Sequence, residues 1–258
     1  MVNKVSIITP TYNSEKYISE TIESVISQTY KEWEMLIVDD CSSDSTCEII
    51  SKYIESDSRI KLVKLEKNSG AAIARNEALN KATGRFIAYL DADDIWFSDK
   101  LSKQVEFMIK EKSGFSCTSY NVISDDGEDL KKKITMKKEL DYTGFLINNL
   151  IQTVGVMVDL EIVDKHRLVM PNMRRRQDAA TWLQVLKSGV NCKGIEESLA
   201  YYRRATGSLS SNKFKAVKGV WYLYREVEKL PLGFACYCFC RYAFLAVWKR
   251  VYLKKCIV

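Results

Sequence analysis

The chain has 258 residues, enough to bury a core of ordinary size in one large domain, or in one domain with an appendage. Its composition, 47% hydrophobic and 28% charged with only three prolines, excludes an extensively disordered or low-complexity protein. The net charge of +6 gathers late in the chain, and no nucleic-acid-binding motif accompanies it. Nucleic acid is therefore not an expected partner.

The N-terminus and the cysteines indicate a cytoplasmic protein. The first ten residues lead straight into an apolar run with neither an h-region nor a cleavage site, so no signal peptide is expected. The eight cysteines form no CxxC pair and have no histidine at metal-ligand spacing, which fits reduced thiols. The single histidine, His166, lies among basic and polar residues, and we expect it to be exposed.

The first 112 residues alternate between strand and helix patterns, which is typical of stacked βα units on a mostly parallel sheet. Helices are expected between four apolar strands at 5–8, 35–38, 60–65 and 86–90.

Three helices can be read between these strands. Apolar residues recur from Ile18 at the spacing of one helical face. Ser45 and Glu48 have the spacing of a capping box at the start of the second helix. An alanine-lined third helix starts at Ala71, and Gly84 can end it by adopting a left-handed conformation.

Polar clusters follow three of the strands: TPTYN after the first, DD (Asp39 and Asp40) after the second and DADD (residues 91–94) after the fourth. Ligands bind open α/β sheets in the crevice beyond the carboxyl ends of the strands. The three clusters are therefore expected to share one cleft.

After residue 112 the periodicity weakens. Residues 124–133 read as a polar hairpin or loop, residues 153–158 as a strand, and the apolar spacing at Ala180, Leu183 and Leu186 as a helix ended by Gly189. This half is expected to complete the cleft with a mixed sheet and helices.

The DADD cluster has the chemistry of a metal site. Mg²⁺ and Mn²⁺ prefer oxygen ligands and are commonly held by one or two carboxylates plus phosphate oxygens and water. Alternation along an extended segment places Asp91 and Asp93 on the same side. A helix N-cap is the alternative, and it stays open mainly for Asp94 and Asp99.

The ordered segments VSIITPTYN, LIVDDCSSDST, AAIARNEAL and GRFIAYLDADDIW resemble the inverting glycosyltransferases of family 2. The resemblance covers roughly residues 5–101 and continues more weakly to about residue 210. It implies an α/β GT-A nucleotide-sugar-binding fold, with a mostly parallel sheet flanked by helices and a mixed acceptor-side half. The implied division is a donor half at 1–112, an acceptor half at 113–210 and a helical tail at 211–258.

The resemblance also implies donor-side roles. Thr9, Pro10 and Tyr12 are implied to pack against the nucleobase and ribose, and Asp39 to read the uracil edge. Arg75 is implied to contact the diphosphate. Asp91 would bind the ribose, or the metal through water, and Asp93 would ligate the metal directly. Local alternatives stay open: Pro10 and Asn13 as turn and cap residues, Tyr12 as packing, Asp40 as the start of an Asx turn, and Arg75 as a solvated helical residue paired with Glu77 or Glu48.

The catalytic base is expected within residues 173–183. Asp178 matches the family's base, with Gln177 where a glutamate often stands, and Trp182 could offer an apolar face to an acceptor sugar. The alternatives are a first-turn acid paired with Arg174 or Arg175, and ordinary core packing for Trp182.

The last 28 residues combine aromatic and basic side chains with no acid, and their apolar runs are too short to span a bilayer. They predict an amphipathic helix lying on an anionic membrane surface, or alternatively a helix packed on the domain.

Together these features predict a Mn²⁺- or Mg²⁺-dependent inverting transferase. It would move a hexose, glucose or galactose, from a UDP-sugar to a polyprenyl-diphosphate-linked saccharide at the inner face of the cytoplasmic membrane, forming a β-linkage in bacterial surface polysaccharide. The alternatives are a non-catalytic UDP-sugar-binding relative and a DxD phosphotransferase or hydrolase, although a phosphotransferase has its DxD after the first strand.

Overall fold

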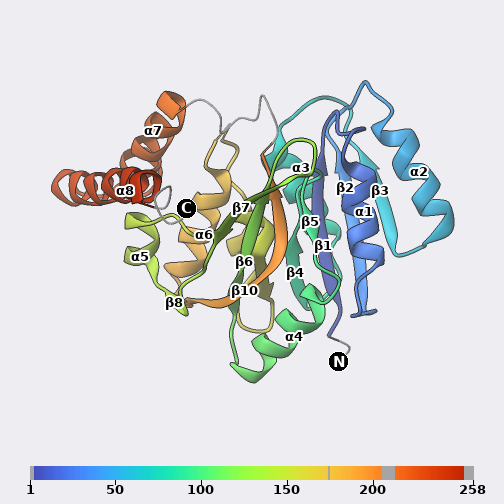
Figure 1. Cartoon of the computed structure of the whole chain (residues 1–258), viewed down its shortest axis with the longest axis horizontal. Helices are drawn as coiled ribbons and strands as arrows, with labels where there is room; N and C mark the ends of the chain where they lie inside the picture. The colour runs from blue at the N-terminus through green and yellow to red at the C-terminus, as the bar shows by residue number, and fades with distance from the viewer. Residues whose placement is uncertain (1–2, 174, 205–212, 253–258) are drawn as a thin grey trace.

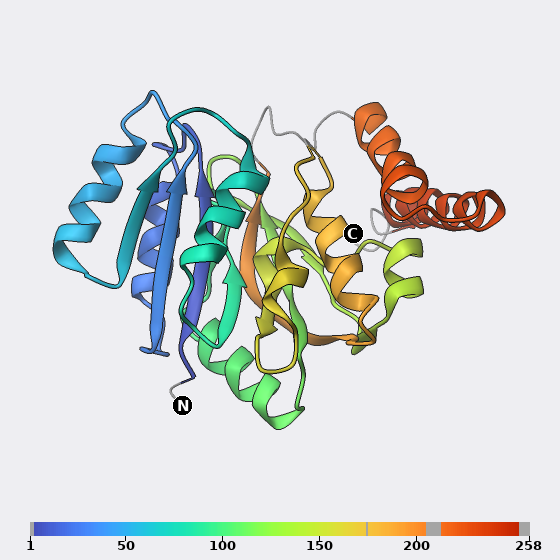
Figure 2. The same cartoon turned by 180° about the vertical axis from the view of Figure 1, so that it is seen from behind.

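The computed structural model describes residues 3–173, 175–204 and 213–252, which form a ten-stranded mixed sheet covered by helices on both faces (Figures 1 and 2). The main path of the sheet runs in the order β3-β2-β1-β4-β9-β6-β10-β5, with β7 added to β6 and β8 to β10. The strands are β1 (Val5–Thr11), β2 (Trp33–Asp39), β3 (Ile60–Lys64), β4 (Phe86–Tyr89), β5 (Ile95–Trp96), β6 (Phe115–Ile123), β7 (Asp129–Ile134), β8 (Glu139–Leu140), β9 (Val156–Asp159) and β10 (Cys192–Arg203).

Strands β3, β2, β1 and β4 are parallel, whereas β9 is antiparallel to both its neighbours β4 and β6. The first half of the chain therefore supplies the parallel part of the sheet, and the mixed part forms mainly after residue 112, as the sequence predicts, with the short β5 joining it antiparallel to β10. The helices are α1 (Ile18–Ile26), α2 (Thr46–Ser56), α3 (Ala71–Lys81), α4 (Lys100–Lys110), α5 (Tyr142–Ile147), α6 (Gln177–Leu186), α7 (Lys213–Tyr222) and α8 (Leu232–Tyr252), with short helices η1 (Thr153–Gly155), η2 (Lys165–Leu168) and η3 (Leu223–Val227).

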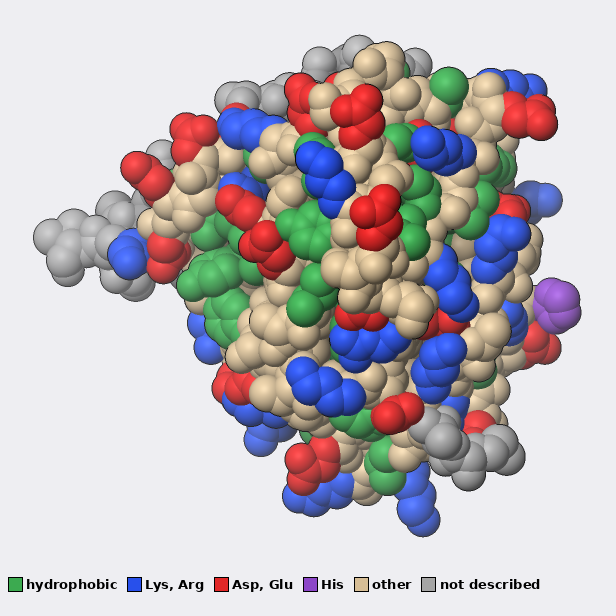
Figure 3. All heavy atoms as spheres, turned by 90° about the vertical axis from the view of Figure 1, so that its right-hand side faces the viewer, with side chains coloured by type: hydrophobic (Ala, Val, Ile, Leu, Met, Phe, Trp, Pro, Cys, Tyr) green, Lys and Arg blue, Asp and Glu red, His purple; other side chains and the backbone are tan. Residues whose placement is uncertain are grey.

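Each face of the sheet has its own core. On one face α1, α2 and α4 bury apolar side chains such as Ile22 and Leu101 against the strands. On the other face α3, α5 and α6 do so, and the alanines of α3, among them Ala74 and Ala78, allow that helix to lie close to the sheet. On the side of the molecule shown in Figure 3, basic and acidic side chains are interspersed rather than gathered into one basic patch.

Two local predictions about helix ends are wrong. Ser45 precedes α2 without making a side-chain cap, and Asp44 Oδ1 instead accepts from the Thr46 N–H at 3.0 Å. Gly84 is not left-handed. A Cβ at that position would lie 2.6 Å from the Lys4 carbonyl oxygen, so glycine is required there by the close approach of strand β1.

In the second half, the predicted hairpin joins β6 to β7, and its loop closes where the Ser124 N–H donates to the Glu128 carbonyl at 2.9 Å. The predicted strand at 153–158 is η1 followed by β9. Helix α6 ends before Gly189, which has a φ of +86°.

The C-terminal helices pack at the end of the molecule beside α5 and α6 (Figure 1). Glu228, 4% exposed at its side chain, accepts from the Tyr142 hydroxyl at 2.5 Å and pairs with Lys187 at 2.6 Å, which fastens this segment to the domain. Helix α8 buries Ala235 and Cys238 on its inner face.

The outer face of α8 departs from the predicted amphipathic pattern. It leaves the apolar side chains of Leu232, Tyr237 and Phe244 50–60% exposed, so its described residues are largely apolar on both faces. Among the helices that the structure describes, none combines the length and the apolar character needed to cross a bilayer.

Candidate active site

The three polar clusters predicted from the sequence meet at one edge of the sheet. Strands β2, β1 and β4 are neighbours, and Thr11 at the end of β1 is the register partner of Asp39 at the end of β2. The Asp40 N–H donates to the Thr11 carbonyl at 2.8 Å, which continues the pairing into the loops. The three clusters therefore share one edge of the sheet, as predicted.

Within the first cluster Tyr12 offers a large aromatic surface to a ligand, being 50% exposed, and Asn13 next to it is exposed as well. Strand β1 continues through Thr11, so Thr9 is fully buried and Pro10 is buried beside it. This corrects the prediction for Thr9, whose side chain is inaccessible to a nucleotide in this conformation. Asn13 does not cap α1. Its Oδ1 accepts from the Ser43 N–H at 2.9 Å.

In the DD pair at the end of β2, the local turn is made by a different aspartate from the one predicted. Asp39, 2% exposed, makes the local turn by accepting from the Ser42 N–H at 3.0 Å and the Ser42 hydroxyl at 2.5 Å. Asp40 reaches across to accept from the Ser69 N–H at 2.6 Å and the Gly70 N–H at 2.8 Å, so it orders the loop before α3. The Asx-type turn expected of Asp40 thus belongs to Asp39.

Arg75 is a buried member of the site and not a solvated helical residue. Its side chain is 7% exposed, and its Nη2 lies 2.5 Å from Asp91 Oδ1. Burial alone would lower the pKa of the guanidinium, but the charges of Asp91 and Asp178 outweigh that effect and raise the pKa. Arg75 is therefore a fixed cation between the DADD loop and the start of α6.

The surroundings of Asp93 disfavour its charged form. Burial, followed by the charge of Asp91, raises its pKa to about 6. Among the described residues no group of three or more acidic, histidine or cysteine side chains could enclose a metal ion. However, a divalent ion shared with a diphosphate needs only one or two carboxylates. The donor set of Asp91 and Asp93 fits such an ion.

Asp94 is structural, as predicted, but it is not a helix cap. It is 1% exposed, and its Oδ1 accepts from the Arg203 N–H at 2.9 Å. Burial and the charges of Asp93 and Asp91 raise its pKa. Asp99 occupies the N-cap position of α4 without a side-chain cap bond.

On the acceptor side, Asp178 lies half-buried in the first turn of α6, close enough for its charge to act on Arg75. Gln177 precedes it, and its Oε1 is buried with no hydrogen-bond partner among the described residues. Trp182 is fully buried, with its ring 5.2 Å from that of Tyr89 between centroids. The prediction that Trp182 contacts the acceptor is therefore wrong: its ring belongs to the core.

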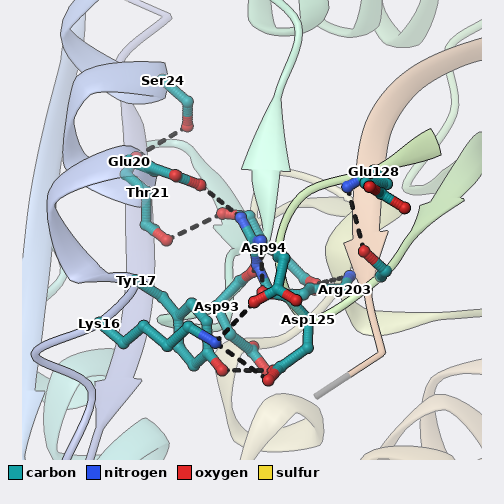
Figure 4. Close-up of polar contacts among 12 residues, drawn as sticks. Lys16, Tyr17, Glu20, Thr21, Ser24, Asp93, Asp94, Asp125, Glu128 and Arg203 are labelled. Atoms are coloured by element: carbon teal, nitrogen blue, oxygen red, sulfur yellow. Dashed lines mark hydrogen bonds and ion pairs between the residues drawn. The ribbon is translucent and has the colours of Figure 1, made fainter. Parts of the chain in front are cut away.

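Sequence reasoning missed Arg203, the last residue of β10, which lies against the back of the DADD loop (Figure 4). Its Nε donates to the Asp93 carbonyl at 2.9 Å, and its guanidinium also pairs with Glu20 of α1. The rule that exposed the other clusters, polar residues at strand ends, would have found it had β10 been recognised.

The family model for glycosyl transferase family 2 matches residues 6–161, more than half of the chain. The chain belongs to glycosyltransferase family 2. This family 2 enzyme is 49% identical to TuaG of Bacillus subtilis (strain 168), named as a teichuronic acid biosynthesis glycosyltransferase, over 96% of the chain and 97% of TuaG. It is 39% identical to WfgD of Escherichia coli, named as a UDP-Glc:alpha-D-GlcNAc-diphosphoundecaprenol beta-1,3-glucosyltransferase, over 89% of the chain and 88% of WfgD.

Solved structures agree on the fold. S. aureus TarS (residues 1–349) in complex with UDP-GlcNAc superposes with a TM-score of 0.72 at 21% identity, covering 93% of this chain and 71% of TarS. The mannosyltransferase PcManGT from Pyrobaculum calidifontis, in complex with GDP-Man and Mn²⁺, gives a TM-score of 0.65 at 18% identity, covering 96% and 75%. At these identities the likeness shows the fold alone. The family 2 glycosyltransferase has the predicted GT-A fold.

Proposed function

We propose that this glycosyltransferase moves a hexose, glucose or galactose, from a UDP-sugar to a saccharide linked to a polyprenyl diphosphate, forming a β-linkage by inversion. The observation on which this rests is the position of Arg75. It pairs with Asp91 of the DADD loop, and the charge of Asp178, from the other half of the chain, contributes to its raised pKa. A donor-side group and a base candidate thus flank one cation. The activity for which WfgD is named, with UDP-Glc as donor and a diphosphoundecaprenol-linked sugar as acceptor, supports both substrate classes.

In this proposal residues 1–112 bind the donor, 113–210 supply the acceptor side and 211–258 form the tail. Tyr12 contacts the nucleobase and ribose beside Pro10, and Asp39 reads the uracil edge. Asp93, with Asp91 through water, would hold Mn²⁺ or Mg²⁺, which would supply positive charge to the departing diphosphate. The Mn²⁺ bound to PcManGT supports a divalent ion in this fold.

Asp178 takes the proton from the acceptor hydroxyl as its oxygen attacks the anomeric carbon in line with the departing UDP. Asp178 lies in the first turn of α6, near enough to Arg75 for its charge to act on that guanidinium, which supports a base beside the donor site. Gln177 beside it contributes to acceptor binding. Arg75 keeps Asp91 oriented toward the donor and adds positive charge near the leaving group.

The decisive experiment is a panel of UDP-sugars with Mn²⁺, scored for release of UDP and then for transfer to polyprenyl-diphosphate acceptors carrying one sugar. General-base help is worth about 10²–10⁴ in rate, so Asp178→Asn should lower kcat by that factor while the affinity for UDP with Mn²⁺ is unchanged. Asp164→Asn, a surface cap on η2, is the matched control. Near-normal kcat in Asp178→Asn would remove it as the base.

The two alternatives give different products. A non-catalytic relative would bind UDP with Mn²⁺ and release no UDP from any UDP-sugar. A DxD phosphotransferase or hydrolase would break the bridge between the two phosphates of the UDP-sugar, so water or an acceptor takes one phosphoryl group; with water the products are UMP and the sugar 1-phosphate, and no UDP is released.

The tail is proposed to hold the enzyme against the inner face of the cytoplasmic membrane, where such an acceptor is presented. The exposed apolar residues Leu232, Tyr237 and Phe244 support this, because apolar side chains with nearby cations favour an anionic lipid interface. Of the basic residues that the sequence places here, Arg241 is described and exposed; the side chains of Lys249, Arg250, Lys254 and Lys255 lie outside the described ones.

Sedimentation with vesicles rich in phosphatidylglycerol tests this surface. Serine at all three of those positions should release the enzyme from the vesicles. The matched control places serine at exposed apolar positions elsewhere: Ile109, Leu130 and Ile162. Equal sedimentation of the two variants would show that α8 is not the contact.

A further inference from the structure

We infer that Arg203 is a positioning residue for the DADD loop, fixing the backbone that presents Asp93 to the donor's metal ion. This inference rests on the proposed metal-dependent transfer. Arg203 lies at the end of β10, far in sequence from the loop, and its side chain is 2% exposed. It is therefore built into the molecule behind the site and does not itself face a ligand.

Arg203 holds two successive residues of the loop by different groups (Figure 4). Its Nε donates to the carbonyl oxygen of Asp93 at 2.9 Å. Its own backbone N–H donates to the carboxylate of Asp94 at 2.9 Å. Rotation of the Asp93 peptide would break the first bond and displace the residue held by the second, so the backbone that carries the Asp93 side chain keeps one conformation.

The guanidinium is in turn fixed from the opposite side. It pairs with Glu20 of α1 and donates through Nη1 to the carbonyl of Asp125 in the β6–β7 loop at 3.1 Å. Its central carbon lies 5.0 Å from the centre of the Tyr17 ring. A planar fork with several donors can make these contacts together, which a lysine ammonium on a flexible chain cannot.

Helix α1 supplies a second hold on the same loop. The Thr21 hydroxyl lies 2.9 Å from the carbonyl oxygens of both Ala92 and Asp94. The Thr21 hydroxyl has one hydrogen to share between these two oxygens, and Arg203 Nε donates to the Asp93 carbonyl between them, so donors from two distant elements hold the loop backbone. The loop can then present Asp91 and Asp93 on a backbone of one conformation, while the carboxylate of Asp94 stays buried against Arg203.

Groups that orient a metal ligand typically contribute about 10- to 100-fold to metal affinity. We expect Arg203→Gln to weaken Mn²⁺ binding in the presence of saturating UDP by that factor, measured from the EPR signal of free Mn²⁺. Arg203→Lys should fall between Arg203→Gln and the wild type. Binding of uridine, which has no phosphate for an ion to bridge, should be unchanged in both variants.

The matched control is Arg85→Gln, because Arg85 also joins distant segments by ion pairs, to Asp159 at 2.6 Å and Glu161 at 2.8 Å, away from the DADD loop. It should lose stability but keep wild-type Mn²⁺ binding. If Arg203→Gln does not fold, Thr21→Val tests the same hold and should weaken Mn²⁺ binding several-fold.

Wild-type Mn²⁺ binding by folded Arg203→Gln, or by Thr21→Val where Arg203→Gln does not fold, overturns the inference. So does an equal loss of uridine binding, which would mean general disruption. A wild-type enzyme that binds no Mn²⁺ with UDP would instead refute the proposed donor site itself.

Discussion

The pair formed by Arg75 and Asp91 allows a quantitative test of the site without any substrate. Arg75→Met keeps much of the side-chain volume but removes the charge, leaving Asp91 without its cation. Removing one partner of a buried ion pair costs about 3–5 kcal/mol. Because the Asp91 side chain is 28% exposed and water can take over part of the interaction, we expect a loss of about 2–3 kcal/mol in unfolding free energy. For a chain of this size, that lowers Tm by about 4–12 °C.

The assay is urea unfolding of the wild type, both single variants and Arg75→Met/Asp91→Asn. The double variant has neither charge, so it should recover at least half of the stability lost in Arg75→Met. The control is Lys81→Met, which breaks an exposed pair with Glu77 and should cost less than about 0.5 kcal/mol. A loss below about 0.5 kcal/mol in Arg75→Met, or strict additivity in the double variant, would refute the assigned pairing.

Two further predictions concern residues outside the chemistry. Trp182→Ala should lower the free energy of unfolding by about 3–5 kcal/mol, because the ring is fully buried. Trp182→Phe should leave the KM for the acceptor unchanged. A raised KM for the acceptor in Trp182→Phe would show that Trp182 contacts the acceptor after all. Burial alone would raise the pKa of Glu34, but hydrogen bonds from Lys61, Thr83 and Ser6 outweigh it and lower the pKa. The ionised Glu34 therefore stabilises the fold above the ordinary pKa of 4.5, and this stabilisation is lost as the pH falls below that value. The difference in unfolding free energy between wild type and Glu34→Gln should accordingly shrink in acid. A difference that does not change with pH would contradict the lowered pKa of Glu34.

The sequence predicts the edge of the site well because strand ends in a parallel sheet follow a simple geometric rule. Asp39, Asp40 and the DADD loop reach one edge since β2, β1 and β4 are neighbours. Burial is harder to predict. Helix α6 is buried from Ala179 to Leu183 on every side, so its apolar periodicity cannot tell whether Trp182 faces the core or the cleft. Thr9 fails similarly, because β1 continues beyond its last aliphatic residue.

The contacts by which Arg203 fixes the DADD loop could not have been predicted from sequence spacing. Arg203 is 183 residues from Glu20 and 78 from Asp125, and no local pattern links positions so distant. Only the order of the strands, with β10 paired to β5 beside the loop, brings them together. Residues that touch ligands often occupy strand ends, whereas residues that orient them can come from any part of the chain that the topology returns to the site.

The charges around the DADD loop lead to a final prediction about the order of events. The loop presents the carboxylates of Asp91 and Asp93, and the pKa of Asp93 is raised because burial and Asp91 leave its charge poorly compensated. A UDP diphosphate brings more negative charge to the same place. At an effective dielectric constant of about 20, unit charges 4 Å apart interact by about 4 kcal/mol.

A divalent ion that relieves even half of this repulsion should strengthen UDP binding by about 2–4 kcal/mol, or about 30- to 700-fold. Calorimetric titration of UDP with Mn²⁺ and with EDTA measures the difference, and uridine, which lacks the diphosphate, should bind equally in both. Equal UDP affinity in the two conditions would mean that Arg75 alone compensates the diphosphate. Because the repulsion acts on the bound nucleotide itself, metal removal should weaken donor binding by that factor and not only slow the transfer.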